Sequence, residues 1–185
     1  MMDINKAYDL LDHYISDEKM KNHCYASEAV MRALAQNLGR DEEKWALAGL
    51  LHDIDAEKTD KDPKRHALVA EEILKPYDID DEIIDAIKMH NEEATGKERS
   101  TEFQHALAAG ETITGLIIAT TLVYPDKKIE SVKPKSIRKR MKEKAFAASV
   151  NRDTIRECEK IGITLDEFIE MSLNAMKKIG PTIGL

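Results

Sequence analysis

The sequence of 185 residues is poor in cysteine and in aromatic side chains, which make up 5% of the chain. Its two cysteines, Cys24 and Cys158, are far apart and show no CxxC spacing. A disulfide framework and a thiolate zinc site are therefore both excluded. Any metal in this protein must be held by histidine and carboxylate side chains.

Long apolar runs are also missing. The most apolar stretch, from about His105 to Leu122, contains Glu111 and four threonines and is well short of the ~20 apolar residues that a membrane helix needs. The start, MMDINKAYDLL, lacks the basic head and apolar middle of a signal peptide. We therefore expect a cytoplasmic protein without a membrane partner.

Two motifs of familiar chemistries are absent as well, the GxSxG elbow and the glycine-rich phosphate loop. Their absence disfavours covalent catalysis and P-loop chemistry. The chain is instead rich in charge, with 35 acidic and 28 basic residues and a net charge of −7, and 42% of its residues are hydrophobic. This composition predicts one globular domain over residues 1–185.

Apolar residues recur at helical spacing through almost the whole chain, and no segment alternates as a half-buried strand does. The sequence therefore predicts an all-α protein. Asp17, Asp41 and Asp80 are placed to cap helices, and Gly39 is placed to end the helix that Asp17 starts. Asp62-Pro63 predicts the start of a further helix, because proline suits the first helical position.

The later part of the chain also reads as helical. The most apolar helix is predicted from about Thr101 to Val123 and should lie centrally. A basic helix is expected within about 134–146, followed by two closing helices. The last of these begins at the capping box Thr164-x-x-Glu167 and ends at Gly180-Pro181.

Four of the six histidines are predicted to face inward. A lone histidine on an apolar face is more often a packed core residue than a ligand. The hypothesis that these histidines bind a metal therefore depends on the whole set. His23 lies on the buried stripe of its helix, His66 leads an apolar face, and His90 ends another. His52 and Asp53 are adjacent where helical periodicity breaks. Adjacent helical residues diverge by ~100°, so this pair can converge on one point only where a helix ends.

A carboxylate is also predicted inside the most apolar helix. Glu111 lies in line with the apolar residues of that helix. A buried, unpaired carboxylate is costly, and coordination to a divalent cation relieves that cost. Imidazoles and carboxylates together suit zinc, iron or manganese.

The ordered set of histidines and acids resembles the HD-domain superfamily of metal-dependent phosphohydrolases, most closely its HDIG-type subgroup. The stretches that carry the resemblance are LLHDID, RHALVAEEIL, IKMHNEEATG and AAGETITGLIIA. The resemblance implies a helical HD core at about 18–125, built around a buried metal site, and a C-terminal helical extension at about 126–185. Glu111 stands where the family more often has Asp, and Asp55 replaces the glycine of HDIG. The Gly-Tyr-Pro signature of the cyclic-dinucleotide branch is absent.

The resemblance also implies roles for individual residues. The residues that match the family's principal metal ligands are His23, His52, Asp53 and Glu111. His66 and His90 match the extra histidines that bind a second ion in two-metal members, where Asp53 bridges. The implied cofactor is one or two divalent ions, among Fe, Mn, Zn, Ni, Co and Mg. The implied activity is hydrolysis of a small phosphorylated metabolite or nucleotide by metal-activated water.

Further candidates are charged residues outside this set. Glu57 and Lys58 follow the metal motif, where they would shuttle a proton or hold a phosphate; the alternative is a solvated loop. One face of the basic helix carries Lys135, Arg138, Lys139 and Lys142 and is expected either to bind the substrate phosphate or to be solvated. Asn91 and Glu92 are expected to orient His90.

Three other functions remain open. The first is a non-catalytic metal or nucleotide sensor, and the second is a di-iron oxygenase on the same scaffold. The third is an RNA- or DNA-binding helical protein that uses residues 133–144. Nucleic acid ranks below a small substrate, because the net charge is −7 and no aromatic residue lies among the cations of that segment. The sequence does not predict the oligomeric state.

Overall fold

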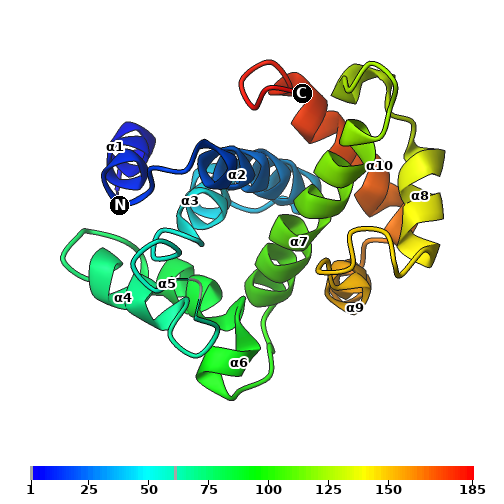
Figure 1. Ribbon diagram of the computed structural model, residues 1–185. Helices are drawn as coiled ribbons and strands as arrows, with labels where there is room; N and C mark the ends of the chain where they lie inside the picture. Colours follow the sequence, from blue (N-terminus) through cyan, green and yellow to red (C-terminus); the bar gives the residue numbers. More distant parts are fainter. Residues whose placement is uncertain (1, 61) are drawn as a thin grey trace.

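The computed structural model describes residues 2–60 and 62–185, and the described chain is helical, with no strand (Figure 1). The all-α prediction is therefore confirmed. The helices are α1 (Ile4–Tyr14), α2 (Glu18–Leu38), α3 (Glu42–Leu51), α4 (Leu68–Leu74), α5 (Asp81–Met89), α6 (Glu92–Thr95), α7 (Glu102–Leu122), α8 (Pro134–Lys142), α9 (Arg152–Ile155) and α10 (Leu165–Lys178). Two 3₁₀ helices, η1 (Ile129–Ser131) and η2 (Arg156–Ile161), lie among the last elements.

The predicted helix caps are present. The carboxylates of Asp17, Asp41 and Asp80 each accept a hydrogen bond from a backbone N–H in the first turn of α2, α3 and α5, respectively. Gly39 ends α2 in the left-handed region, with a φ of 65°. Local capping chemistry therefore sets the limits of the helices that frame the metal motif.

The start of α4 differs from the prediction. Asp62-Pro63 was expected to begin this helix, but residues 63–67 form turns and α4 begins at Leu68. Ala67, directly before the helix, has a φ of 75° and a ψ of −30°, a sparsely populated conformation that costs a non-glycine residue on the order of 1–3 kcal/mol. The buried Asp55 carboxylate accepts hydrogen bonds from the N–H groups of Ala67 and Ala70, which holds the turn and starts α4 after it. As a result, His66 lies in a turn rather than on a helix.

The core forms where α2 packs against α3, α7 and α10. α2 and α3 approach closely at Gly49, where an added Cβ would lie 2.6 Å from the carbonyl oxygen of Ser27. Only glycine fits this contact, because the obstacle is backbone that cannot move aside. The close approach brings the end of α3, with its HD motif, against the face of α2 that carries His23.

The long helix α7 runs through the middle of the molecule (Figure 1). By length and composition alone it could span a membrane, but most of its apolar residues are buried among the other helices, as in the core helix of a globular protein. The C-terminal elements pack on the same core: η2, α9 and α8 contact α7, and α10 contacts both α2 and α7. The C-terminal extension therefore shares its interior with the HD core.

Candidate metal centre

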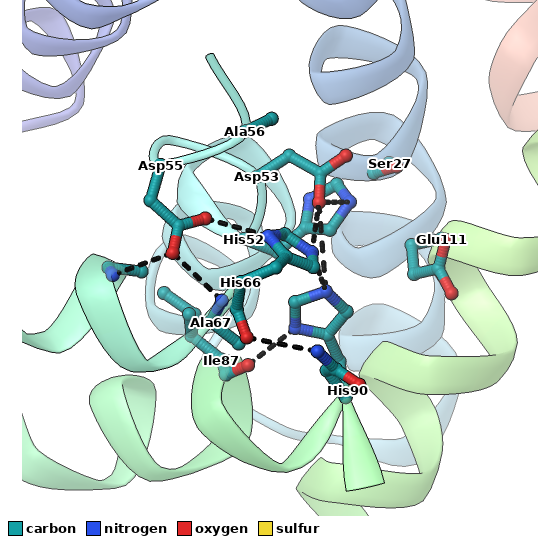
Figure 2. A network of polar contacts seen from close by, with 12 residues as sticks. Ser27, His52, Asp53, Asp55, Ala56, His66, Ala67, Ile87, His90 and Glu111 are labelled. Atoms are coloured by element: carbon teal, nitrogen blue, oxygen red, sulfur yellow. Dashed lines mark hydrogen bonds and ion pairs between the residues drawn. The ribbon is translucent and has the colours of Figure 1, made fainter. Parts of the chain in front are cut away.

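Two groups of potential ligand atoms lie side by side at the end of α3. The first group comprises His23, His52 and Asp53, and the second comprises Asp53, His66 and His90. Within each group the ligand atoms all lie within 4.8 Å of one another. Asp53 belongs to both groups, and Figure 2 shows it above the ring of His90. We name them the first and the second cluster.

The first cluster joins α2 to the end of α3. The Nε2 atoms of His23 and His52 are 3.1 Å apart, and Oδ2 of Asp53 lies 3.6 Å from Nε2 of His23. Glu111 on α7 faces the same space, and its Oε2 lies 3.7 Å from Nε2 of His23. Together with Glu111, the first cluster therefore has four donors, which come from α2, α7 and the α3 terminus.

The second cluster joins the turn before α4 to the end of α5. Oδ1 of Asp53 lies 3.1 Å from Nε2 of His66 and 3.6 Å from Nε2 of His90. The Nε2 atoms of His66 and His90 are 3.0 Å apart. Oδ2 of Asp53 thus faces His23, whereas Oδ1 faces His66 and also lies 3.5 Å from Nε2 of His52. The carboxylate therefore contacts both clusters, as a bridging ligand would.

In each cluster, backbone carbonyls fix one histidine ring. Nδ1 of His52 donates to the carbonyl oxygen of Gly49 at 2.8 Å, and Nδ1 of His90 donates to that of Ile87. A carbonyl only accepts, so the proton of each ring must lie on Nδ1. The Nε2 atom of each ring is then a bare lone pair available to a cation.

Side chains fix the other two rings in the same sense. Nδ1 of His66 donates to Asp55 at 2.7 Å. Nδ1 of His23 lies 2.9 Å from the Thr114 hydroxyl, whose own hydrogen goes to the carbonyl oxygen of Glu111 at 2.6 Å, so the ring donates and the hydroxyl accepts. Each ring therefore directs its Nε2 atom into its cluster. The Nε2 atoms of each pair lie 3.0–3.1 Å apart, and a metal ion in each cluster would take the place of any proton between them.

Burial and neighbouring charges shift the pKa values of His52 and His66 in opposite directions. Burial lowers the pKa of His52 to about 3, which keeps this ring neutral. Burial alone would lower the pKa of His66 too, but hydrogen bonds to Asp53 and Asp55 outweigh it and raise the pKa to about 10. Without a metal, His66 therefore holds a proton near neutral pH.

The pKa values of the two carboxylates shift in opposite directions. Burial alone would raise the pKa of Asp53, but the surrounding imidazoles, His52 foremost, hold it well below its usual range. Burial raises the pKa of Glu111, and the attraction of His23 offsets this only in part. Neutral imidazoles together with carboxylates form the donor set of zinc, iron and manganese, so the residues present fit a divalent metal.

The two predicted catalytic residues in the loop lie apart from the clusters. The Glu57 carboxylate accepts hydrogen bonds from the backbone N–H groups of Ser16 (2.7 Å) and Asp17 (2.8 Å), which lower its pKa. It therefore secures the start of α2. Lys58 is exposed. The structure brings neither side chain into contact with a predicted metal ligand.

The cations of the basic helix are also apart from the metal clusters. α8 packs against α7 and α10, and in Figure 1 it lies across α7 from α3 and α5. Arg138 pairs with Asp166 at 2.5 Å and with Glu170 at 2.8 Å, both on α10. The other three members of the face are exposed: Lys135, Lys139 and Lys142. The acidic residues of α10 therefore neutralise part of the face that the sequence predicts to bind the substrate phosphate.

Three supporting groups were not assigned such roles from the sequence. Asp55 was noted only as a departure from glycine, whereas it holds His66 and the start of α4. Thr114 was not singled out, whereas its hydroxyl holds the ring of His23. Asn91 was expected to orient His90 but instead donates to the carbonyl oxygens of Pro63 and His66, so it braces the second cluster from the other side.

Helices packed around a buried His–Asp centre define a class of metal-binding hydrolase folds, and comparison with known proteins narrows this class. The HD domain family model matches residues 20–124, more than half of the chain, so this protein belongs to the HD-domain family. The expected resemblance is confirmed, and the family supports hydrolase chemistry at a divalent metal.

Curated relatives include ribonuclease Y of Mycoplasma mycoides, 37% identical over 82 residues, which are 44% of this chain and 19% of the relative. Ribonuclease Y of Mycoplasma capricolum subsp. capricolum is 35% identical over 82 residues, which are 44% of this chain and 16% of the relative. The chain thus matches less than a fifth of the length of these relatives. No solved structure gave a significant match.

Proposed function

We propose that this protein hydrolyses a phosphate ester of a small phosphorylated metabolite or nucleotide, using one or two divalent ions. The observation that carries the proposal is the pair of clusters that share Asp53, with the Nε2 atoms of four histidines directed inward. The family membership supports a hydrolase of this class. The burial of most of α7 supports a place for this helix in a protein interior rather than in a bilayer.

The chemistry follows from how the residues hold the reacting groups. A metal held by these donors would lower the pKa of bound water to ~7 and polarise a phosphoryl oxygen. Asp53 lies between the clusters, with Oδ2 near His23 and Oδ1 near both His52 and His66, and so fixes their separation. Asp55 and Thr114 keep the His66 and His23 rings in the tautomer that ligates. Glu111 adds a negative charge beside His23, which favours a cation in the first cluster.

The test is elemental analysis of protein purified without chelators, followed by a phosphate-release screen across metals and phosphorylated compounds. The proposal expects about one or two equivalents of metal and metal-dependent release of phosphate. Bound metal without turnover on any phosphorylated compound would favour the sensor. Iron-dependent oxygen uptake in place of phosphate release would favour the oxygenase.

A second candidate is hydrolysis of RNA phosphodiester bonds, and the ribonuclease Y relatives favour it. The exposed lysines of α8 offer an anion-binding surface for a longer substrate. End-labelled oligoribonucleotides, tested beside mononucleotides at two salt concentrations, separate the candidates. Cleavage with a steep salt dependence supports RNA, because polyanion binding releases counterions. Turnover of mononucleotides alone supports the small substrate.

A further inference from the structure

A buried ion pair lies beside the second cluster and has no part in the chemistry proposed above. Arg99, in the loop between α6 and α7, pairs with Glu157 of η2 through two parallel hydrogen bonds. Nε of Arg99 donates at 2.8 Å and Nη2 donates at 2.7 Å. The two side chains are 6% and 12% exposed, so this is an interior contact between the HD core and the C-terminal extension.

The third nitrogen of Arg99 reaches the end of α5, where His90 lies. Nη1 donates to the carbonyl oxygens of Met89 at 3.0 Å and of His90 at 3.2 Å. The last carbonyls of a helix have no partner within the helix, and a cation there is favoured by the helix dipole. Arg99 therefore fixes the backbone from which the His90 ring projects.

Glu157 holds Arg99 from the side of the extension. Its Oε2 also accepts from Nδ1 of His105 on α7 at 2.6 Å, so the carboxylate is tied to two core elements at once. η2, which carries Glu157, packs along α7. Arg99 has a second carboxylate partner, since Oε2 of Glu92 lies 3.2 Å from its Nη2, but only Glu157 pairs with it through two parallel hydrogen bonds. Loss of Glu157 therefore removes the partner that fixes the plane of the guanidinium group.

The first cluster has no such tie. His52 is held by the carbonyl of Gly49 within its own helix terminus, and His23 is held by Thr114 on α7. Neither ring is hydrogen-bonded to Arg99 or Glu157. A change at the ion pair should therefore reach the second cluster through His90 and spare the first.

We propose that Arg99 and Glu157 are positioning residues for His90, so that the C-terminal extension sets the affinity of the second cluster for its metal ion. The proposal rests on the metal-binding role proposed above but does not depend on which substrate is hydrolysed. Nε2 of His90 must lie within reach of both Asp53 and His66, which are 3.6 Å and 3.0 Å away. A shift of the α5 terminus would open these distances.

The test measures binding of Mn²⁺ by calorimetry to protein freed of metal. In wild type we expect two ions, and His90→Ala reports the affinity of the first cluster alone. Glu157→Gln removes the charge but keeps the shape of the side chain. This substitution should weaken binding of the second ion about 10- to 100-fold, as substitution of other residues that orient a metal ligand does. The affinity for the first ion should change by less than about 3-fold.

The double variant Glu157→Gln/His90→Ala makes the test specific. If Glu157 acts through His90, the double variant binds the first ion as His90→Ala does, because the two changes are not additive. An additional loss in the double variant would show a general structural role and overturn the proposal. Binding of a single ion by wild type would overturn it too. Weakened second-ion binding without phosphate release would leave it intact and contradict only the proposed hydrolysis.

Two further variants guard against loss of folding. Arg99→Lys keeps the positive charge but removes the planar guanidinium group that makes two parallel hydrogen bonds to Glu157. This variant should therefore lose part of the affinity of the second cluster for its metal ion. Glu102→Gln breaks a pair of the same chemistry with Arg40 (2.7 and 3.2 Å) on the surface at the start of α7. This control should leave both affinities unchanged. Circular dichroism and thermal melting confirm that each variant is folded, and equal effects of Glu157→Gln and Glu102→Gln would overturn the proposal.

Discussion

The two clusters have similar ligands but are held in different ways. The first takes its donors from the long helices α2 and α7 and from the end of α3, where the ring of His52 is fixed by its own helix. The second takes His66 from a turn and His90 from the end of the nine-residue helix α5. In each cluster one ring is held by a backbone carbonyl and the other by a side chain. The first cluster is framed by long helices, whereas the second lies at a turn and a helix end that the side chains of Asp55 and Arg99 hold in place.

This difference predicts that the second cluster is the more sensitive to substitutions outside the ligands. The second cluster has three such supporting side chains, each hydrogen-bonded to His66 or His90: Asp55, Asn91 and Arg99. In the first cluster, the corresponding partners are the Gly49 carbonyl and the Thr114 hydroxyl. The substitutions below distinguish the clusters, from the largest expected effect to the smallest.

The largest effect is expected at Asp53, the residue that the clusters share. Asp53→Ala removes the carboxylate that both clusters share, so bound metal and hydrolysis should be lost together. Elemental analysis and phosphate release on the same preparation measure both. Full metal content with wild-type turnover would show that the site is assigned wrongly.

Asp55 should affect the second cluster alone. Asp55→Ala frees the His66 ring and leaves the N–H groups of Ala67 and Ala70 without an acceptor. We expect the metal-to-protein ratio to fall from about two to about one. The free energy of unfolding should fall by about 1–3 kcal/mol, the cost of buried donors left unpaired.

His66→Ala is the matched control for Asp55→Ala. It removes the ligand but keeps the carboxylate that holds the start of α4, so the metal ratio should fall in the same way with a smaller loss of stability. Urea denaturation of the metal-free proteins makes this comparison. An unchanged metal ratio with a raised KM would instead assign His66 to substrate binding.

The sequence predicts the parts of this molecule that local patterns determine. Helical periodicity and the capping aspartates locate most helices, and the His52-Asp53 pair marks the end of α3. The predicted start of α4, Pro63, lies five residues before the observed start, Leu68. The difference arises because the buried carboxylate of Asp55, from another segment, holds the turn before the helix. No local pattern reveals such a contact.

Other contacts escape prediction for the same reason. The Arg99–Glu157 pair joins residues 58 positions apart, and each residue alone looks like an ordinary surface charge. The basic helix reads as a free cationic face, because the α10 acids that pair with Arg138 lie 28 and 32 positions further along the chain. Long-range polar pairing is a property of the folded core and of its register, which periodicity does not specify.

Proton release should differ between the clusters. The pKa of His66 is raised to about 10, so the ring is protonated at pH 7 and a metal must displace that proton; the pKa of His52 is lowered to about 3, so that ring has none to lose. The affinity of the second cluster should therefore fall about tenfold for each unit by which the pH drops below 9, while that of the first responds less. Calorimetry in buffers of different ionisation enthalpy measures the protons released. Equal release by wild type and His66→Ala would contradict this assignment.

The smallest effect is expected at Glu111, on the periphery of the first cluster. Glu111→Asp shortens the arm by one methylene but keeps the carboxylate, and Oε2 of Glu111 already lies 3.7 Å from Nε2 of His23, the outermost distance among these donors. Substantial activity and an unchanged second-ion affinity should remain, because no contact of the second cluster passes through this residue. Metal titration of Glu111→Asp beside Glu111→Ala provides the measurement. If the shorter carboxylate abolished metal binding as fully as alanine does, α7 would be spaced for the longer arm, and the first cluster would depend on side-chain reach as strongly as the second.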